Sequence, residues 1–163
     1  MVNARASWTW DAMMQRAVVK IWFISDGGSI AADLRKFLLG QSDPNTPLAV
    51  SEAISLDSSL NIDLAVDPRF LSDDVEQAVV TALTEPEKGL LALQNIPIGL
   101  PLFRSAILAQ IHAVPGVTSV RALRFSGTEA PFGIAAGEGE YHNFLSGLVA
   151  GNTAAGDVLF AAS

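Results

Sequence analysis

The sequence has no cysteine, few basic residues and no long apolar run. The absence of cysteine excludes disulfides and thiolate metal sites and is compatible with any redox compartment. Lys and Arg number 10 against 17 Asp and Glu, which gives a formal net charge of −7, and the basic residues are scattered. Phosphate neutralisation needs a basic stripe, so we expect no nucleic acid and no anionic membrane surface as a ligand. The apolar runs also fall short of the ~18 residues of a spanning helix, so we expect no membrane insertion.

Apolar residues are abundant instead. The chain is 50% hydrophobic and only 17% charged, against roughly 25% charged residues in a typical soluble domain. This composition excludes disorder across the whole chain. A length of 163 residues suffices for one ordinary domain or for two small modules that share a core. The surplus of apolar residues therefore indicates either a generous core or apolar surface that meets partner proteins, and the low charge favours buried interfaces.

The first 66 residues carry two strand signals with a helix signal between them. Residues 17–24 are apolar on both faces and rich in β-branched and aromatic side chains, which predicts a central, covered strand. A turn at 25–28 follows, and Ser29 can cap a helix whose apolar residues recur at helical spacing, namely Ile30, Leu34, Phe37 and Leu38. Gly40 and residues 42–47 end that helix. Residues 60–66 alternate apolar and polar side chains, which predicts a half-buried strand.

Two helices are predicted between residues 67 and 116. Residues 67–70 break the preceding strand, and Ser72 is expected to cap a helix with an acidic first turn and a stop at Pro86, its apolar stripe being Val75, Val79, Ala82 and Leu83. Residues 85–99 are expected to form a loop with a short strand. Pro101 suits the first turn of the second helix, whose apolar face is Phe103, Ile107, Leu108 and Ile111.

An abrupt turn is predicted where this second helix ends. Pro115 cannot continue a helix, and Gly116 can adopt positive φ, so the two residues form a structural turn. Residues 117–125 then leave the turn as a strand. The sequence therefore predicts an α+β fold of two small strand–helix modules with mixed sheets, followed by an irregular glycine-rich extension with little core of its own. The expected divisions are an N-terminal segment 1–16, modules at 17–70 and 71–126, and the extension 127–163.

A set of turn and apolar positions resembles a known family. A strand ends near "DPRF", and the helix "SDDVEQAVVTAL" follows. After a spacer come "IGLPLFRSAILAQIHAVPGVTSVRALRF" and then "GEGEYHNF". This order of elements resembles the carboxy-terminal half of the baseplate J family of phage tails. The match covers residues 50–145. Its positions are Leu102, Ser105, Ile107, Ile111, Val114, Gly116, Val117, Val120, Leu123, Gly139, Glu140 and Tyr141.

The resemblance implies a structural role. Baseplate J proteins are wedge components of contractile tails, without a known active site, that pair with copies of themselves or related subunits and transmit strain to the sheath. It implies copies of this chain and other baseplate or tail proteins as partners, no cofactor, and a place in the virion tail baseplate after assembly in the host cytoplasm. The residues that we expect at an interface are Trp8, Trp10, Arg121, Arg124, Tyr141 and Phe144.

Two alternative sites can be read from short motifs. The Gly27-Gly28 turn lies between a strand and a helix, a context that can cradle phosphate on backbone N–H groups, as in a small nucleotide- or phosphate-binding enzyme domain. It lacks the spacing of a P-loop or a dinucleotide fingerprint, which favours a plain turn. In an extended strand Glu138, Glu140 and His142 would point the same way and could bind a divalent metal, against the simpler expectation of a solvated strand.

The remaining candidates have simple structural explanations. His112 near a helix end favours the negative end of the helix dipole. Asp63 and Asp67 could form a carboxylate pair, although Asp67 before a proline is typical of a turn. The N-terminal cluster of Trp8, Trp10, Met13 and Met14 is compatible both with a core and with an anchor on a neighbouring protein, since aromatic residues and Met are enriched at interfaces.

Overall fold

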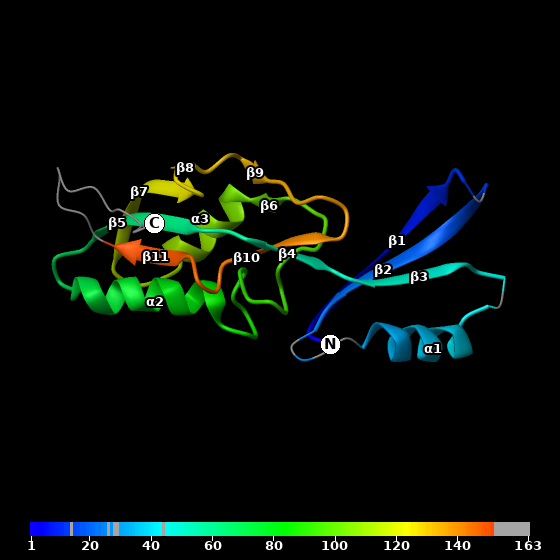
Figure 1. Cartoon of the computed structure of the whole chain (residues 1–163). Coiled ribbons are helices and arrows are strands. Elements are labelled where there is room, and N and C mark those ends of the chain that lie inside the picture. The colour runs from blue at the N-terminus through cyan, green and yellow to red at the C-terminus, as the bar shows by residue number, and fades with distance from the viewer. Residues whose placement is uncertain (14, 26, 28–29, 44, 152–163) are drawn as a thin grey trace.

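The computed structural model describes residues 1–13, 15–25, 27, 30–43 and 45–151. These residues form three helices and several mixed sheets, which confirms the α+β class. Two lobes follow one another along an elongated molecule (Figure 1). We call residues 1–52 the small lobe and residues 53–151 the large lobe. None of the helices in the described part of the chain is long and apolar enough to span a membrane.

The small lobe is a three-stranded sheet with one helix. Strands β1 (Asn3–Asp11) and β2 (Arg16–Ile24) form an antiparallel hairpin, and β3 (Leu48–Glu52) pairs parallel to β2. Strand β2 is central, as predicted, but residues 19–21 are only half-buried, so it is less covered than its apolar sequence indicates. The helix α1 (Ala31–Gln41) connects β2 to β3 and runs one residue past Gly40. The cap predicted at Ser29 lies outside the described residues.

One extended run, residues 48–66, connects the two lobes by passing through three sheets. After β3 it forms β4 (Ile54–Asp57), which pairs parallel with β10 (Glu140–Asn143). It then forms β5 (Leu60–Val66), which lies between β7 (Val117–Phe125) and β11 (Leu148–Gly151). Strand β8 (Thr128–Glu129) extends that sheet beyond β7. Strands β5 and β7 have the predicted bounds, and β5 shows the expected alternation because Leu60, Ile62 and Leu64 are fully buried.

Helices α2 (Ser72–Thr84) and α3 (Arg104–His112) pack on the sheet of the large lobe (Figure 1). The predicted stripe of α2 is confirmed at Val75, Val79 and Leu83, which are buried. The predicted cap at Ser72 is wrong, because Ser72 is the first helical residue and follows Leu71 at the cap position without a side-chain cap bond.

Two predictions about the approach to α3 are also wrong. Pro101 precedes the helix, because residues 102–103 form the short strand β6 (Leu102–Phe103), paired with β9 (Gly133–Ile134). Residues 85–99 contain turns and no strand. That loop still contributes Leu91, Ala92, Ile96 and Ile98 to the core of the large lobe.

The described part of the predicted extension, residues 127–151, completes this core. It supplies β8 to β11 and buries Ala130, Ile134, Tyr141 and Phe144 against residues from earlier in the chain. The predicted divisions at 16/17, 70/71 and 126/127 remain predictions. Strand pairing crosses each of them, because β1 pairs with β2, β5 with β7, and both β10 and β11 with the run 48–66.

Candidate functional site

Strand β1 exposes its apolar residues and turns its polar residues toward the protein. The more exposed positions along the strand are Ala4, Ala6, Trp8 and Trp10, and the half-buried ones are Asn3, Arg5, Ser7, Thr9 and Asp11. Trp8 is 70% exposed and Trp10 is 63% exposed. A strand that served only to cover a core would show the opposite arrangement, with apolar residues inward. The outward face of β1 is therefore a candidate interaction surface.

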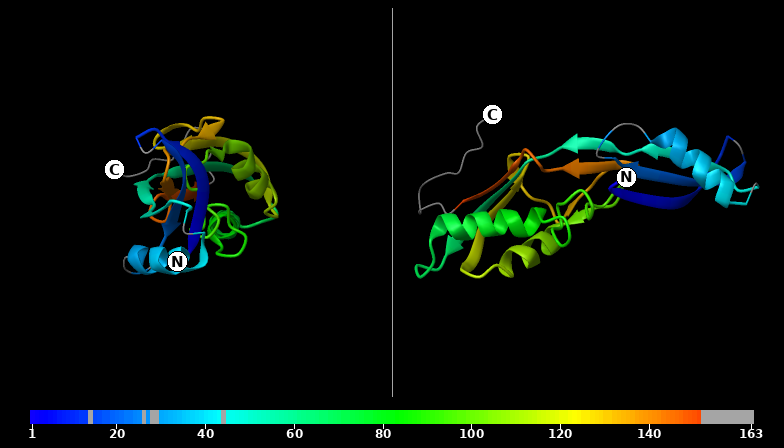
Figure 2. Two further views of the ribbon diagram at one scale, coloured as in Figure 1. Left: turned by 90° about the vertical axis from the view of Figure 1, so that its right-hand side faces the viewer. Right: turned by 90° about the horizontal axis from the view of Figure 1, so that it is seen from below.

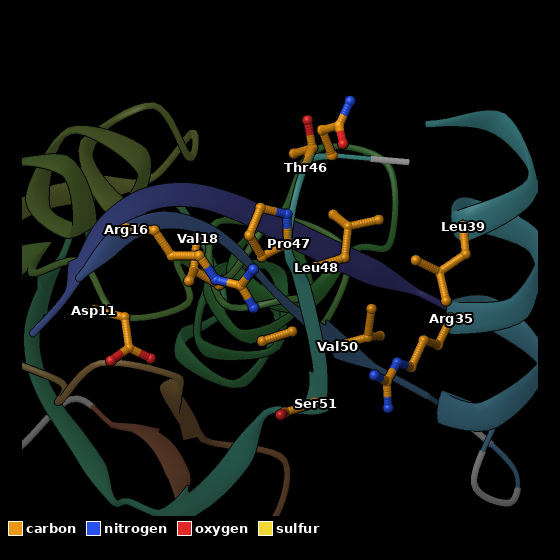
Figure 3. Close-up of a pocket in the computed structure, with 12 residues that line it drawn as sticks. Asp11, Arg16, Val18, Arg35, Leu39, Thr46, Pro47, Leu48, Val50 and Ser51 are labelled. Atoms are coloured by element: carbon orange, nitrogen blue, oxygen red, sulfur yellow. The ribbon is translucent and has the colours of Figure 1, made fainter. Parts of the chain in front are cut away.

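The strand register extends this apolar face across the sheet. Residues directly opposite on neighbouring strands share a face, so Trp8, Val19 and Leu48 form one row. Ala6, Ile21 and Val50 form the next row. Helix α1 packs against β3, and its Leu39 and Arg35 reach toward Leu48 and Val50 (Figure 3). The helix therefore covers the β3 side of the face and leaves the two tryptophans on β1 uncovered.

Strand β1 is also an edge of its sheet. The order of strands is β1-β2-β3, so among the described residues no strand pairs with the outer side of β1, which lies on the outside of the small lobe (Figure 2). Unpaired N–H and C=O groups on such an edge are a template for another strand. Of the two alternatives for the N-terminal cluster, the core is excluded for Trp8, Trp10 and Met13, which are exposed. Met14 lies outside the described residues.

The inward face of β1 holds the small lobe against the large lobe. The Asn3 amide Nδ2 donates hydrogen bonds to the carbonyls of Leu93 and Ile96, at 3.1 and 2.8 Å. Arg5 Nη1 donates to the carbonyl of Ile98 at 2.6 Å. These bonds fix one face of β1 on the loop 85–99, so the tryptophan face points away from the large lobe.

The net charge is distributed unequally between the lobes. Residues 1–52 contain five Lys and Arg and five Asp and Glu, so the formal net charge of the small lobe is zero. Residues 53–163 contain five Lys and Arg and twelve Asp and Glu, and they carry the whole net charge of −7. The exposed tryptophans therefore lie on the neutral lobe, where association with another protein meets no net repulsion.

An open pocket of about 650 Å³ lies between α1, β3 and the far end of the hairpin (Figure 3). Its ionic groups are Asp11, Arg16 and Arg35, and its apolar lining includes Val18, Leu39 and Leu48. Asp11 and Arg16 are opposite each other in the hairpin register. Groups of both charges and apolar side chains therefore line one hollow beside β3.

The structural turn has the geometry predicted for it. Gly116 adopts φ +93°, and a Cβ atom there would lie 2.8 Å from Val75 Cγ2 and 3.0 Å from Phe70 Cγ. The Gly116 carbonyl accepts a hydrogen bond from the Asp67 amide at 2.9 Å. Pro115 and Gly116 thus join the end of β5, the start of α2 and the start of β7, which is an architectural role.

Asp67 belongs to this turn rather than to a carboxylate pair. Arg69 Nη2 donates to Asp67 Oδ2 at 2.6 Å, and this hydrogen bond is the main cause that lowers the pKa of Asp67 to about 2. Asp63 lies in β5, 3.8 Å from a guanidinium nitrogen of Arg121. The two carboxylates have different cationic neighbours, so the structure does not bring them together as acid and base.

The other expected interface residues divide into exposed and buried ones. Arg121 is exposed and Arg124 is half-buried on β7, so both remain candidates for an interface. Tyr141 and Phe144 are buried in the core of the large lobe, which corrects the expectation that they face a partner. They are buried because β10 pairs with β4 and the chain then turns back into β11, which encloses both rings.

The acidic residues and histidine of the segment 137–142 do not gather. Glu138 forms an ion pair with Lys20 at 3.2 Å. Glu140 accepts a hydrogen bond from the Gly137 amide at 2.8 Å, and His142 is buried. Gly139 has φ +78°, so the segment is a turn before β10 and not the extended strand that the metal hypothesis requires. Among the described residues no group of three His, Asp or Glu could hold a metal ion.

His142 instead connects three segments of the large lobe. Its Nε2 lies 2.8 Å from the Ala135 carbonyl, which can only accept, so this nitrogen donates. Its Nδ1 lies 2.8 Å from the Ser58 hydroxyl, which also donates to the Leu56 carbonyl at 3.1 Å. Phe125 packs edge-on against the imidazole, with 5.2 Å between ring centroids. A serine and a histidine in contact have the composition of a nucleophile–base pair, but here both are buried. Their contact holds β10 to the connection between β4 and β5.

The phosphate hypothesis falls partly outside the described residues, since it rests on Gly28 and Ser29 as well as on Gly27. Gly27 is exposed. The His112 prediction agrees with the structure, because His112 is the last residue of α3 and a basic side chain there lies at the negative end of the helix dipole.

A second exposed aromatic group was missed in the sequence. Phe132 is 90% exposed and, with Phe103, Ser105 and Leu108, lines an open hollow of about 490 Å³ on the large lobe. The only signal for it is the position of Phe132 between Pro131 and Gly133, since a large aromatic residue in a turn cannot be buried easily.

Comparison with known proteins gives a structural likeness but no family. No protein-family model matches the sequence, and no curated protein matches it. A chain in the cryo-EM structure of the anti-feeding prophage baseplate, 6-fold symmetrised, aligns with 76% of this chain at 15% identity and a TM-score of 0.47. The alignment covers 29% of that baseplate chain, so the present chain spans less than a third of its length. A likeness of this degree assigns neither a family nor a function.

Proposed function

We propose that this chain is a structural subunit of the baseplate of a phage tail or phage-like contractile injection machine, and that it works through protein–protein contacts. The observation that carries the proposal is the inverted polarity of β1, which leaves Trp8 and Trp10 exposed on the outer edge of a sheet. Aromatic residues exposed in this way are typical of interfaces, where they act as anchors. The resemblance of residues 50–145 to the baseplate J family supplies the kind of assembly.

The finer role is that of a wedge component. Its partners are copies of the chain and other baseplate or tail proteins, and its place is the tail baseplate, assembled in the host cytoplasm. On this proposal the chain carries out no catalytic step. Gly116 and the hydrogen bonds of Asn3 and Arg5 serve to keep the lobes and their surfaces in a fixed arrangement.

Neighbouring genes provide a first test. Genes for a tail tube, a sheath, a lysozyme-like hub and tail fibres beside this gene support the proposal, whereas a metabolic operon contradicts it.

Particle assembly provides the decisive test. In a host that produces the tail particles, the gene is replaced by a variant with Trp8→Ala and Trp10→Ala. The expected result is a loss of at least tenfold in intact baseplates counted by negative-stain electron microscopy, because hot-spot aromatic residues dominate interface energies. The matched control is Phe37→Ala, since Phe37 is 64% exposed but lies on α1. Normal particles from the double variant, or particles that lack this chain altogether, would overturn the proposal.

A further inference from the structure

We propose that β1 pairs antiparallel with β1 of a second copy of this chain, with Ser7 on the two-fold axis. The three-stranded sheets of the two small lobes then form one continuous six-stranded sheet. This inference names the partner of the surface described above, and so it rests on the proposal that the chain works through protein contacts. It is carried by the sequence of the edge strand, by the lobe charges and by the exposed tryptophans.

The sequence of β1 is complementary to itself in one register. The strand comprises Asn3–Asp11, and Ser7 is its central residue. When two such strands pair about Ser7, all nine residues find a partner. Trp8 then lies opposite Ala6 of the partner subunit, and Trp10 lies opposite Ala4 of the partner subunit. Each large side chain meets a small one, which lets both copies pack closely on the same face.

Symmetric registers centred closer to the C-terminal end of β1 lose this complementarity. Centring the pair on Trp8 places the two bulky indoles directly opposite each other and leaves Asn3 and Ala4 unpaired. Centring it on Thr9 places Trp8 opposite Trp10 of the partner subunit and pairs only the last five residues of β1. In the Ser7 register Trp8 and Trp8 of the partner subunit are instead diagonal neighbours, about 7–8 Å apart, a separation that aromatic rings can bridge.

The polar face of β1 also fits this register. Opposite positions combine Arg5 with Thr9 of the partner subunit and Asn3 with Asp11 of the partner subunit. No two like charges oppose each other, and like charges directly opposite would destabilise the pair. The bonds of Asn3 and Arg5 to the loop 85–99 use side chains, so they leave the outer backbone edge of β1 available for the second copy.

The charge distribution permits this association. The small lobe has no net charge, whereas residues 53–163 carry −7. Antiparallel pairing places the two large lobes at opposite ends of the joined strands, because each lobe adjoins the Asn3 end of its own β1. A nine-residue strand spans about 30 Å, which exceeds the Debye length of about 8–10 Å in physiological salt. The acidic lobes therefore repel each other little.

The buried area is compatible with a specific interface. Two indoles of this exposure present roughly 300 Å² per copy, against about 800 Å² per partner in an interface of standard size. The backbone edges, Ala4 and Ala6 add to this area. The tip of each hairpin, with the exposed Met13, then lies beside the Asn3 end of the other β1.

Cysteine cross-linking tests the register in the full-length chain. The natural sequence contains no cysteine, so any disulfide reports only the introduced residue. In Ser7→Cys the two Cα atoms of a pair are expected about 4.5–5.5 Å apart, within the disulfide range that ends near 7 Å. The matched control is Thr9→Cys, on the same face of β1, whose two Cα atoms would be about 13 Å apart in this register. We expect oxidised Ser7→Cys to form a covalent dimer at least tenfold faster than Thr9→Cys.

Sedimentation equilibrium tests the surface independently of cysteine. Trp8→Ala with Trp10→Ala should raise the dissociation constant of the dimer at least tenfold, whereas Phe37→Ala should leave it unchanged. Circular dichroism confirms that each variant is folded. Equal cross-linking of the two cysteine variants, no cross-linking of Ser7→Cys, or a wild-type chain that stays monomeric at millimolar concentration would each overturn the pairing. If the tryptophan variants still abolish particle assembly while the purified chain is monomeric, the proposed function stands and its partner is a different protein.

Discussion

The outer strand of the small lobe and the core of the large lobe use their aromatic residues in opposite ways. In the large lobe Phe144 and Tyr141 are enclosed by the core, together with Phe125, which packs against the buried His142. In the small lobe Trp22 and Phe23 on β2 are buried, whereas Trp8 and Trp10 on β1 are mainly exposed. The large lobe has enough strands and helices to cover its sheet, whereas the small lobe has three strands and a single helix in its described part. The apolar residues of β1 therefore become surface.

This difference indicates that the large lobe mainly determines the stability of the fold, whereas the small lobe mainly determines association with other proteins. The large lobe carries the net negative charge, which favours solubility, and contains most of the buried apolar core. The small lobe is neutral and depends on the large lobe through the bonds of Asn3 and Arg5. Substitutions in the large lobe should therefore change folding, and substitutions on the face of β1 should change association.

Truncation of equivalent aromatic residues should have the largest effect in this comparison. Phe144→Ala removes a side chain that is 1% exposed, and it should lower the free energy of unfolding by about 3–5 kcal/mol because a cavity remains. Trp10→Ala, in a strand face open to solvent, should change it by at most about 0.5 kcal/mol. Urea unfolding of dilute, monomeric chain measures both values. Similar losses in the two variants would show that the lobes do not differ as described.

A substitution at the structural turn should have the next largest effect. Gly116→Val places a β-branched residue at φ +93° and against Val75 and Phe70. The backbone strain and the overpacking together should cost about 2–5 kcal/mol in unfolding free energy. The control is Gly127→Ala, because Gly127 has φ +83° but a Cβ atom there would have no neighbouring atom within 4 Å. That variant pays only the backbone cost of about 1–2 kcal/mol. Equal losses would contradict the steric role of Val75 and Phe70.

Local patterns predicted those elements whose apolar residues face the core. Residues 60–66 alternate in sequence and in burial, and residues 117–125 follow a helix stop that two residues define. In these segments the local preference and the tertiary structure agree, so the sequence is sufficient. Gly116 was predictable for the same reason, since only a turn explains a glycine after Pro115 at the end of a helix.

Elements that depend on distant pairing were not predictable. Strand β1 alternates Ala4, Ala6, Trp8 and Trp10 with polar residues. Such alternation usually indicates that the apolar side is buried, whereas here the apolar side faces solvent. The burial of Tyr141 and Phe144 depends on pairing with strands about 85 residues earlier in the chain, which no local window contains. The exposure of Trp8 and Trp10, the main feature of the candidate surface, likewise follows from the number of elements available to cover the sheet.

A substitution at the contact between the lobes should have a moderate effect on stability and on the position of the small lobe. Gly139 has φ +78°, and a Cβ atom there would overlap the indole of Trp22 on β2. Gly139→Ala should therefore displace the small lobe and lower the unfolding free energy by about 1–3 kcal/mol. Trp22 fluorescence, measured with Trp8→Phe and Trp10→Phe in the background, should shift to longer wavelength. Gly133→Ala is the control, because a Cβ atom at Gly133 makes only ordinary contact, at 3.6 Å from Pro101. An unchanged spectrum would show that Trp22 does not hold the lobes together.

The smallest expected effect concerns the ion pair of Asp67 and Arg69, on the acidic lobe. The hydrogen bond from Arg69 lowers the pKa of Asp67 from 3.8 to about 2, so its contribution to stability is present above pH 4 and is lost as the pH falls toward 2. Arg69→Gln should raise the pKa of Asp67 toward its ordinary value and remove this dependence, with little change at pH 7 because the pair is exposed. NMR titration of the Asp67 carboxyl carbon measures the pKa directly. Asp67 and Arg69 lie on the large lobe, so wild type and Arg69→Gln should associate equally through the Trp8 and Trp10 surface at pH 7. A difference in association would contradict the separate roles of the two lobes.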